Sequence, residues 1–254
     1  MRKVFFLLFF CPFFINAQKD TIIQRPFAIE LGINAITLPV GSFGNTESGG
    51  GYASKQIKST FLDNASVFLE LRYSPKKPIV TNIFGLKSTT VFAARISAFA
   101  VGFDTESFDK NLNNNVSGNA FQSDAKDYRA INFMLGVYDL YNITKKKRKL
   151  FFYDRIYLGL TSANLPALST SVNGVKQIQR NSASATAFSV QCGIGVYKTF
   201  SKKFSTAFGI DYFYTKPIFK NVKTETVNGT TTFSNVITPI SILTVMSISF
   251  NFAL

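Results

Sequence analysis

Apolar and polar residues alternate along much of this chain with a period of two. The clearest stretch runs from residue 185 to 197, where Phe188, Val190, Cys192 and Ile194 alternate with polar or small residues. Because successive side chains of a strand point to opposite faces of a sheet, this pattern predicts strands with one apolar face. Segments of this kind recur about eight times, and we predict strands at 26–38, 64–75, 88–102, 128–141, 150–163, 184–199, 204–216 and 237–253.

The predicted strands are long, and the connections between them alternate in length. Soluble strands most often have about 5 to 6 residues, whereas a tilted strand needs about 9 to 11 to cross a membrane. Long external loops and short periplasmic turns are typical of outer-membrane barrels. We therefore predict an all-β fold, an eight-stranded antiparallel up-and-down transmembrane β-barrel. The long polar connections lie at 39–63, 103–127, 164–183 and 217–236.

Two of these connections carry features that predict surface loops. Residues 111–119 are rich in Asn, Ser and Gly, a composition typical of a mobile loop. The run from Gly49 to Gly51 lacks the Lys-Ser/Thr pair and the following helix of a phosphate-binding loop, so we expect a flexible loop there as well.

The N-terminus predicts export from the cytoplasm. Basic residues at Arg2 and Lys3 precede an apolar run at 4–15, and Ala17 offers a small residue for cleavage. The run is too short for a transmembrane helix, which needs about 20 apolar residues. We expect a cleaved signal peptide at 1–17, a barrel domain at 18–254, and location in the outer membrane of a Gram-negative bacterium.

The polar face of the predicted strands carries three acidic and three basic residues. With the apolar face toward lipid, we expect these six side chains to meet inside the barrel, where opposite charges offset the cost of burial. An eight-stranded barrel has room for little more than its own side chains, so a polar core is favoured over a selectivity filter. The predicted interior network comprises Glu30, Glu70, Arg72, Arg95, Arg155 and Asp211.

The opposite face predicts contact with lipid. Cys192 falls on this face and should behave as a small apolar residue. Asp139 and Asp154 also point outward and face each other near the periplasmic rim, where a cation site competes with headgroup-level solvation or a local bulge. In the final strand we expect Ile240, Ile242, Met246, Ile248, Phe250 and Phe252 on one face, and Ser241, Ser247, Ser249 and Asn251 on the other.

The chain carries a formal net charge of +14, and many of its basic residues occur in short connections. The most concentrated group is predicted to form a basic periplasmic turn facing lipid headgroups or cell-wall polymers, although a solvated turn without a ligand is the commoner case. We do not expect nucleic-acid binding, because the positive charge is divided among separate turns. The residues of this turn are Lys145, Lys146, Lys147, Arg148 and Lys149.

The residue types present predict no enzyme. The chain has no histidine, which removes the Ser-His-Asp and Cys-His arrangements and the usual zinc sites. Outer-membrane barrel enzymes such as omptin proteases and palmitoyl transferases rely on a histidine. Glu30 and Glu70 could form a carboxylate pair for glycoside hydrolysis, yet the nearby arginines should keep both ionised. We expect no catalytic residue, cofactor or metal.

Residues 26–254 as a whole resemble the small outer-membrane β-barrels of the OmpA/OmpX type. The resemblance rests on the signal ending at Ala17, the eight alternating segments and the terminal run from Ser247 to Phe252. It implies a monomer that contacts outer-membrane lipids and the barrel-assembly machinery, with a structural or surface-interaction role through its external loops and a surface or envelope protein as partner. The alternatives are a narrow transport or secretion-associated barrel and a soluble ligand-binding barrel.

Overall fold

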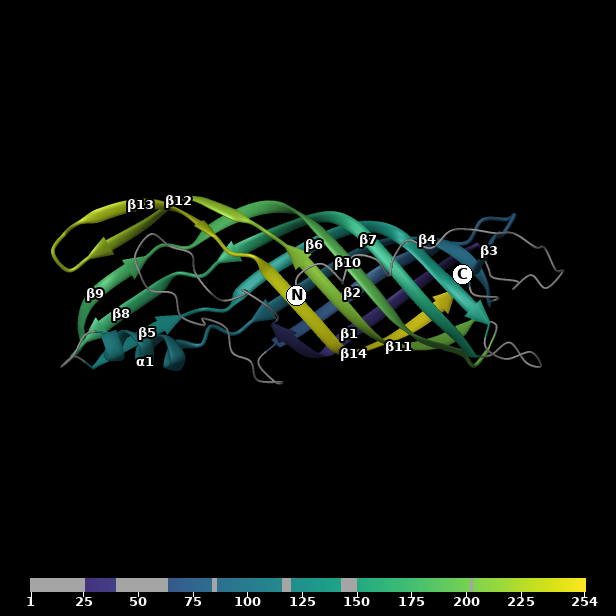
Figure 1. The fold of residues 1–254 in the computed structure, drawn as a ribbon, viewed down its shortest axis with the longest axis horizontal. Coiled ribbons are helices and arrows are strands. Elements are labelled where there is room, and N and C mark those ends of the chain that lie inside the picture. Colours follow the sequence, from purple (N-terminus) through teal and green to yellow (C-terminus); the bar gives the residue numbers. More distant parts are fainter. Residues whose placement is uncertain (1–25, 40–63, 84–85, 116–119, 143–149, 202) are drawn as a thin grey trace, which may run out of the picture.

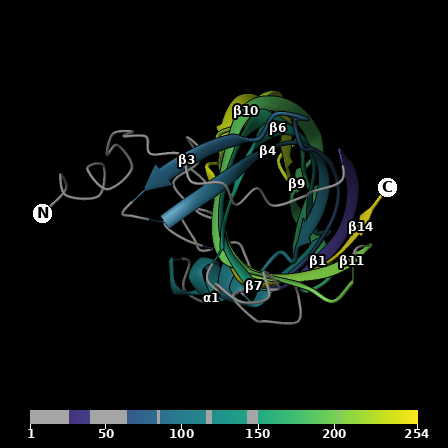
Figure 2. The ribbon, with the colours of Figure 1, turned by 90° about the vertical axis from the view of Figure 1, so that its right-hand side faces the viewer.

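Eight long antiparallel strands form a closed barrel. The computed structural model describes residues 26–39, 64–83, 86–115, 120–142, 150–201 and 203–254. The barrel strands follow the order β2-β1-β14-β11-β10-β7-β6-β4, and pairing of β2 with β4 closes the ring (Figures 1 and 2). Closure leaves no free edge along this ring. The strands are β1 (Phe27–Pro39), β2 (Asn64–Tyr73), β4 (Leu86–Val101), β6 (Tyr128–Asn142), β7 (Leu150–Leu165), β10 (Ala183–Thr199), β11 (Phe204–Thr215) and β14 (Ile240–Ala253).

The alternating pattern locates all eight barrel strands, so the predicted fold is confirmed. Large apolar side chains cover the outside of the wall; Leu135 is 70% exposed and Phe188 is 60% exposed. A surface of this kind is stable against lipid and costly against water, so the barrel is of the outer-membrane type. We call this surface the apolar belt. It includes Val67, Leu69, Leu71, Phe92, Ile96, Ile131, Phe133, Leu135, Ile156, Leu158, Leu160, Phe188, Ile194, Phe208 and Ile210.

Three of the predicted long loops carry regular structure beyond one end of the barrel, on the left in Figure 1. Their strands form a second sheet in the order β13-β12-β9-β8-β5, which we call the outer sheet. By the length of its connections this end is the extracellular one. The sequence predicted these segments as long polar connections, and their strands were not predicted. The outer sheet comprises β5 (Phe121–Ala125), β8 (Leu168–Val172), β9 (Val175–Arg180), β12 (Ile218–Thr226) and β13 (Thr231–Ile237).

A helix, α1 (Thr105–Asn115), stands where the sequence predicted a mobile Asn-rich loop. Phe108 and Leu112 are four residues apart on one helix face, and both are buried. Packing of this apolar pair outweighs the poor helix propensity of asparagine. Asn113 and Asp109 then accept hydrogen bonds from backbone amides of β5, at 2.8 and 2.9 Å, which joins the helix to the outer sheet. The remaining expected loop residues 116–119, and Gly49 to Gly51, lie outside the described residues.

The last strand contains a β-bulge that changes which side chains face the lumen. Ser247 pairs with Gly209 of β11, but Thr244 pairs with Asp211, so β14 has one extra residue between these pairs. Phe250 and Phe252 point outward as expected, whereas Ile240 and Ile242 are 1% and 4% exposed and lie in the core. The prediction of a single apolar face along β14 was wrong, because a bulge reverses the alternation beyond it.

The opposite end of the barrel carries the short connections and the C-terminus. After β2 the chain forms a short strand, β3 (Ile79–Ile83), which pairs with the start of β4 beyond the ring (Figure 2). The predicted basic turn at 145–149 and the predicted signal peptide lie outside the described residues. Among the residues that are described, no helix has the length and apolar character to cross a membrane.

Candidate functional site

The structure places all six residues of the predicted network inside the barrel. Strand register explains how they meet. Glu30 of β1 lies directly opposite Glu70 of β2, and Glu70 lies opposite Arg95 of β4. Alternation turns each of these side chains to the lumen, and every member of the network is at most 4% exposed. We call these residues the polar network: Glu30, Glu70, Arg72, Arg95, Arg155 and Asp211.

Arg72 links the two glutamates that face each other across β1 and β2. Its Nε donates to Glu70 Oε1 at 2.7 Å, and its Nη2 contacts Glu30 Oε2. The guanidinium also lies 4.0 Å from the centre of the Tyr138 ring. Two carboxylates in direct opposition would repel each other, so a cation between them makes their burial tolerable.

Arg155 and Asp211 form the best-defined ion pair of the polar network. Arg155 donates from Nε to Asp211 Oδ1 at 2.9 Å and from Nη2 to Oδ2 at 2.5 Å. This two-point geometry suits a guanidinium and a carboxylate. Gly193 makes the approach feasible, because a Cβ at that position would lie 1.9 Å from Asp211 Oδ1. The glycine of β10 therefore leaves room for the side chain of Asp211 on the neighbouring strand β11.

Arg95 is held differently from the other two arginines. Its Nε lies 3.9 Å from Glu70 Oε2, and its guanidinium stacks 3.6 Å from the centre of the Phe68 ring. Glu70 Oε2 instead accepts a hydrogen bond of 2.6 Å from the Tyr157 hydroxyl. Within the described part of the chain, none of the guanidinium nitrogens of Arg95 makes a hydrogen bond. Ring stacking and long-range attraction are its main contacts.

Apolar clusters fill the lumen on both sides of the polar network. Toward the periplasm, Tyr138, Tyr153 and Tyr197 belong to one buried cluster. Toward the outside, Phe99 and Phe213 meet with ring centres 5.6 Å apart in a larger cluster that extends into the outer sheet. The alternation predicts the charges in the lumen, whereas the grouping of aromatic residues into layers above and below them depends on the stagger between strands.

The two outward carboxylates near the periplasmic rim lie opposite each other, as expected. Asp139 pairs with Asp154 in an unbroken register, so the local bulge, one of the three alternatives, is absent between these strands. The Thr90 hydroxyl donates to Asp139, and the Tyr141 hydroxyl donates to Asp154 at 3.1 Å. No group of three or more metal-binding side chains occurs among the described residues. Each of the two carboxylates therefore accepts a hydrogen bond from a neighbouring hydroxyl.

Above the membrane, Arg180 fixes the outer sheet to the barrel. It is 8% exposed, and its Nη2 donates to the Pro166 carbonyl at 3.2 Å. Burial lowers the pKa of the Arg180 guanidinium, while the Tyr128 hydroxyl beside it acts in the opposite direction. Arg180 was not predicted as a structural residue, because it lies in the predicted long polar connection 164–183. The turn signal Asn173-Gly174 was present, and both residues adopt positive φ, as a tight hairpin requires.

Comparisons with known proteins return structures but no sequence relatives. No family model matches the chain, and no curated protein matches it significantly. Neisserial surface protein A shares 12% identity at a TM-score of 0.41, over 90% of this chain and 97% of its own. The Ail protein of Yersinia pestis shares 13% at 0.39, over 91% and 100%.

A third similar structure is an enzyme. The outer membrane protease OmpT of Escherichia coli shares 7% identity at a TM-score of 0.43, over 92% of this chain and 99% of its own. These similarities are confined to barrel shape, and at such values they carry no information on activity. The assignment to the outer-membrane barrels rests on the closed ring and the apolar belt of this chain.

Proposed function

We propose that this protein is a non-enzymatic outer-membrane barrel that acts through its extracellular surface, with the barrel as a closed anchor. The observation that carries the proposal is the outer sheet together with α1. Short loops would be enough to join the barrel strands, yet these connections form regular secondary structure. Its β12–β13 hairpin packs Phe219, Val222 and Val236 into the buried cluster that continues into the barrel. A surface held in one conformation suits the recognition of a partner, because little conformational entropy is lost on binding.

The outer sheet also exposes apolar side chains far from the apolar belt. Val227 and Phe233 lie on the β12–β13 hairpin and are 53% and 66% exposed, and Val175 at the β8–β9 turn is 56% exposed. These residues lie on the outer sheet, outside the apolar belt, where binding of a partner would remove them from water. Exposed apolar groups rimmed by polar residues are typical of protein interaction sites.

The filled lumen argues against passage of solutes. The polar network is enclosed by apolar clusters on both sides, and its six charges balance to zero. An eight-stranded barrel leaves little space beyond its own side chains. The absence of histidine from the sequence removes the common general base of hydrolytic barrel enzymes.

A cell-surface assay tests the proposal. Bacteria displaying the protein should clump or attach to protein-coated plastic at least about twofold more than cells without it, and the variant Val227→Ser/Phe233→Ser should lose this gain. The control Thr230→Ser/Thr232→Ser changes polar residues of the same hairpin. Equal behaviour of wild type and empty cells would contradict the proposal.

Reconstitution in planar bilayers separates this function from the transport alternative. The wild-type barrel should show no steady single-channel conductance, because its lumen is filled. Steady conductance that changes in the variant Arg95→Ala would contradict the proposed function. It would show that the barrel is a narrow channel gated by the polar network.

A further inference from the structure

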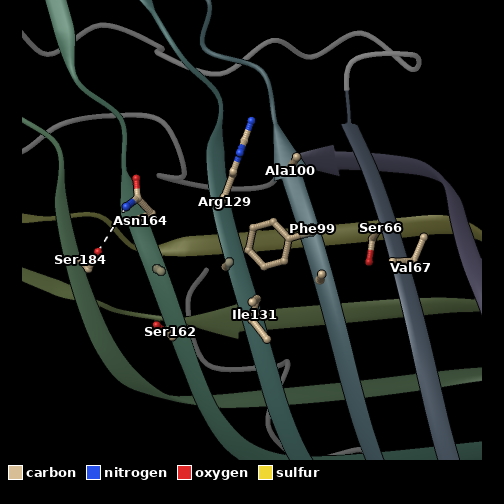
Figure 3. A pocket seen from close by; sticks show the side chains of 12 residues that line it. Ser66, Val67, Phe99, Ala100, Arg129, Ile131, Ser162, Asn164 and Ser184 are labelled. Carbon is tan, nitrogen blue, oxygen red and sulfur yellow. Dashed lines mark hydrogen bonds between the residues drawn. The ribbon is translucent and has the colours of Figure 1, made fainter.

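The outer wall of the barrel has a hollow at the upper edge of the apolar belt. Its volume is about 580 Å³, and it extends across one continuous side of the wall, formed by β2, β4, β6, β7 and β10 (Figure 3). All its lining residues belong to these neighbouring strands, and most have side chains on the outward face. It therefore opens toward lipid, and we call it the wall groove.

Small side chains create the wall groove. On the outward face, β4 carries Ala98 and Ala100, and beyond β6 the next strands carry Ser162 and Ser184. The belt below has bulky residues such as Phe133 and Leu160 at the corresponding positions. Val67 stands at its β2 side, and Ile131 of the central strand β6 lies between Ala98 and Ser162. The result is a depression with a mainly apolar floor, of a kind that an acyl chain can fill with close contact.

Polar groups line the extracellular side of the wall groove. Arg129 points outward from β6, two residues from Ile131 on the extracellular side (Figure 3). The Asn164 side chain of β7 donates a hydrogen bond of 3.2 Å to the Ser184 hydroxyl of β10. Arg129 makes no salt bridge with any described residue. At the upper edge of the belt, this guanidinium lies at the depth of lipid headgroups and matches a phosphate in charge and shape.

We propose that the wall groove binds one acyl chain of a phosphorylated lipid of the outer leaflet, with Arg129 against its phosphate. The apolar floor would provide contact area for the acyl chain. Arg129 would favour a lipid whose headgroup carries a negative charge. The partner is therefore an anionic lipid, and a zwitterionic lipid lacks the net charge that Arg129 would favour.

Native mass spectrometry of the purified protein in detergent tests this site with lipid A, which carries phosphates and acyl chains, and with phosphatidylethanolamine as the zwitterionic comparison. Arg129→Gln removes the charge and keeps the hollow, whereas Ala98→Leu fills the hollow and keeps the charge. Two matched controls lie on the same wall outside the wall groove: Ala94→Leu on β4 and Lys198→Gln on β10, both at exposed positions. Retained heat-modifiable gel migration shows that each variant is folded.

Wild-type protein should bind lipid A more tightly than phosphatidylethanolamine. Each of Arg129→Gln and Ala98→Leu should weaken lipid A binding about tenfold, the loss expected for one charge-assisted hydrogen bond or a comparable apolar contact, and the controls should not. If Ala98→Leu does not fold, Ala100→Leu replaces it. Equal binding of the two lipids, or equal losses in the controls, would overturn the proposal. Full binding by Ala98→Leu would also overturn it, because the wall groove would then hold no chain.

Discussion

Arg129 and Asp139 point outward from β6, ten residues apart, and bracket the apolar belt on that strand. Between them, Ile131, Phe133 and Leu135 face lipid. Ten residues of antiparallel strand span about 34 Å, and a tilt of about 45° reduces this to about 24 Å across the membrane, close to the ~25 Å apolar band of outer-membrane barrels. Two charged side chains thus mark the membrane boundaries.

Leu135, near the middle of this span, should be intolerant of charge. Leu135→Arg places a cation at the bilayer centre and should lower the free energy of unfolding by about 2 to 4 kcal/mol. Urea titration of the protein folded into lipid vesicles measures the change, with Leu135→Met as the matched control. A loss below about 1 kcal/mol would mean that the belt does not lie at the depth that Arg129 and Asp139 indicate.

The barrel strands could be predicted from the sequence because a two-residue period is a local property. Ile29 and Leu31 alternate with Glu30 whatever the rest of the chain does, so the burial of Glu30 followed directly from the pattern. Its contact with Arg72 could not be predicted in the same way. That contact depends on the stagger between strands, which pairing sets across the whole ring.

The outer sheet was missed although its turn signals were present. Asn-Gly between alternating segments is a strong hairpin signal, and it occurs at Asn173-Gly174 and at Asn228-Gly229. The bulge in β14 also had a trace in the sequence, since the adjacent apolar residues Val245 and Met246 break the alternation. Such breaks are also common in regular strands. Only the pairing with β11 shows that the side chains of β14 beyond the bulge change from one face of the wall to the other.

The ion pair between Arg155 and Asp211 should matter most to stability when only one partner is removed. Asp211→Asn leaves a buried guanidinium without a counter-charge, and we expect a loss of about 3 to 5 kcal/mol in unfolding free energy. The double variant Arg155→Met/Asp211→Leu removes both charges and should recover most of that loss. Urea titration of the wild type, Arg155→Met, Asp211→Leu and the double variant gives the coupling energy.

Gly193→Ala provides an independent check of the same pair, because its added Cβ would displace Asp211. It should destabilise the barrel in the wild-type background and less in an Asp211→Ala background, where only the contact with the Ile210 backbone carbonyl at 3.0 Å remains. Ser189→Ala, at a buried position on the same strand, serves as the control. Equal effects of Gly193→Ala in both backgrounds would contradict the assigned contact.

The bulge in β14 should be required for folding. Deleting Met246 removes the extra residue opposite β11, so the register would carry Ile240 and Ile242 out of the core or break the pairing. We expect the deletion variant to lose the heat-modifiable gel band that a closed barrel shows. Met246→Leu keeps the residue count and should retain that band, and a folded deletion variant would show that the strand tolerates either register.

The face of β10 that carries Cys192 should be in lipid, and a spin label at this residue can show it. Cys192 points outward between Tyr212 of β11 and Ile156 of β7 and is half-buried. After labelling of the unfolded chain and refolding into bilayers, with Cys11→Ser to leave one thiol, the label should be more accessible to oxygen than to a polar nickel complex. Thr230→Cys in a chain with Cys192→Ser, on the exposed outer sheet, should show the reverse preference. If the label at Cys192 were as accessible to nickel as the label at 230, this face would be in water, and the soluble ligand-binding barrel would replace the membrane assignment.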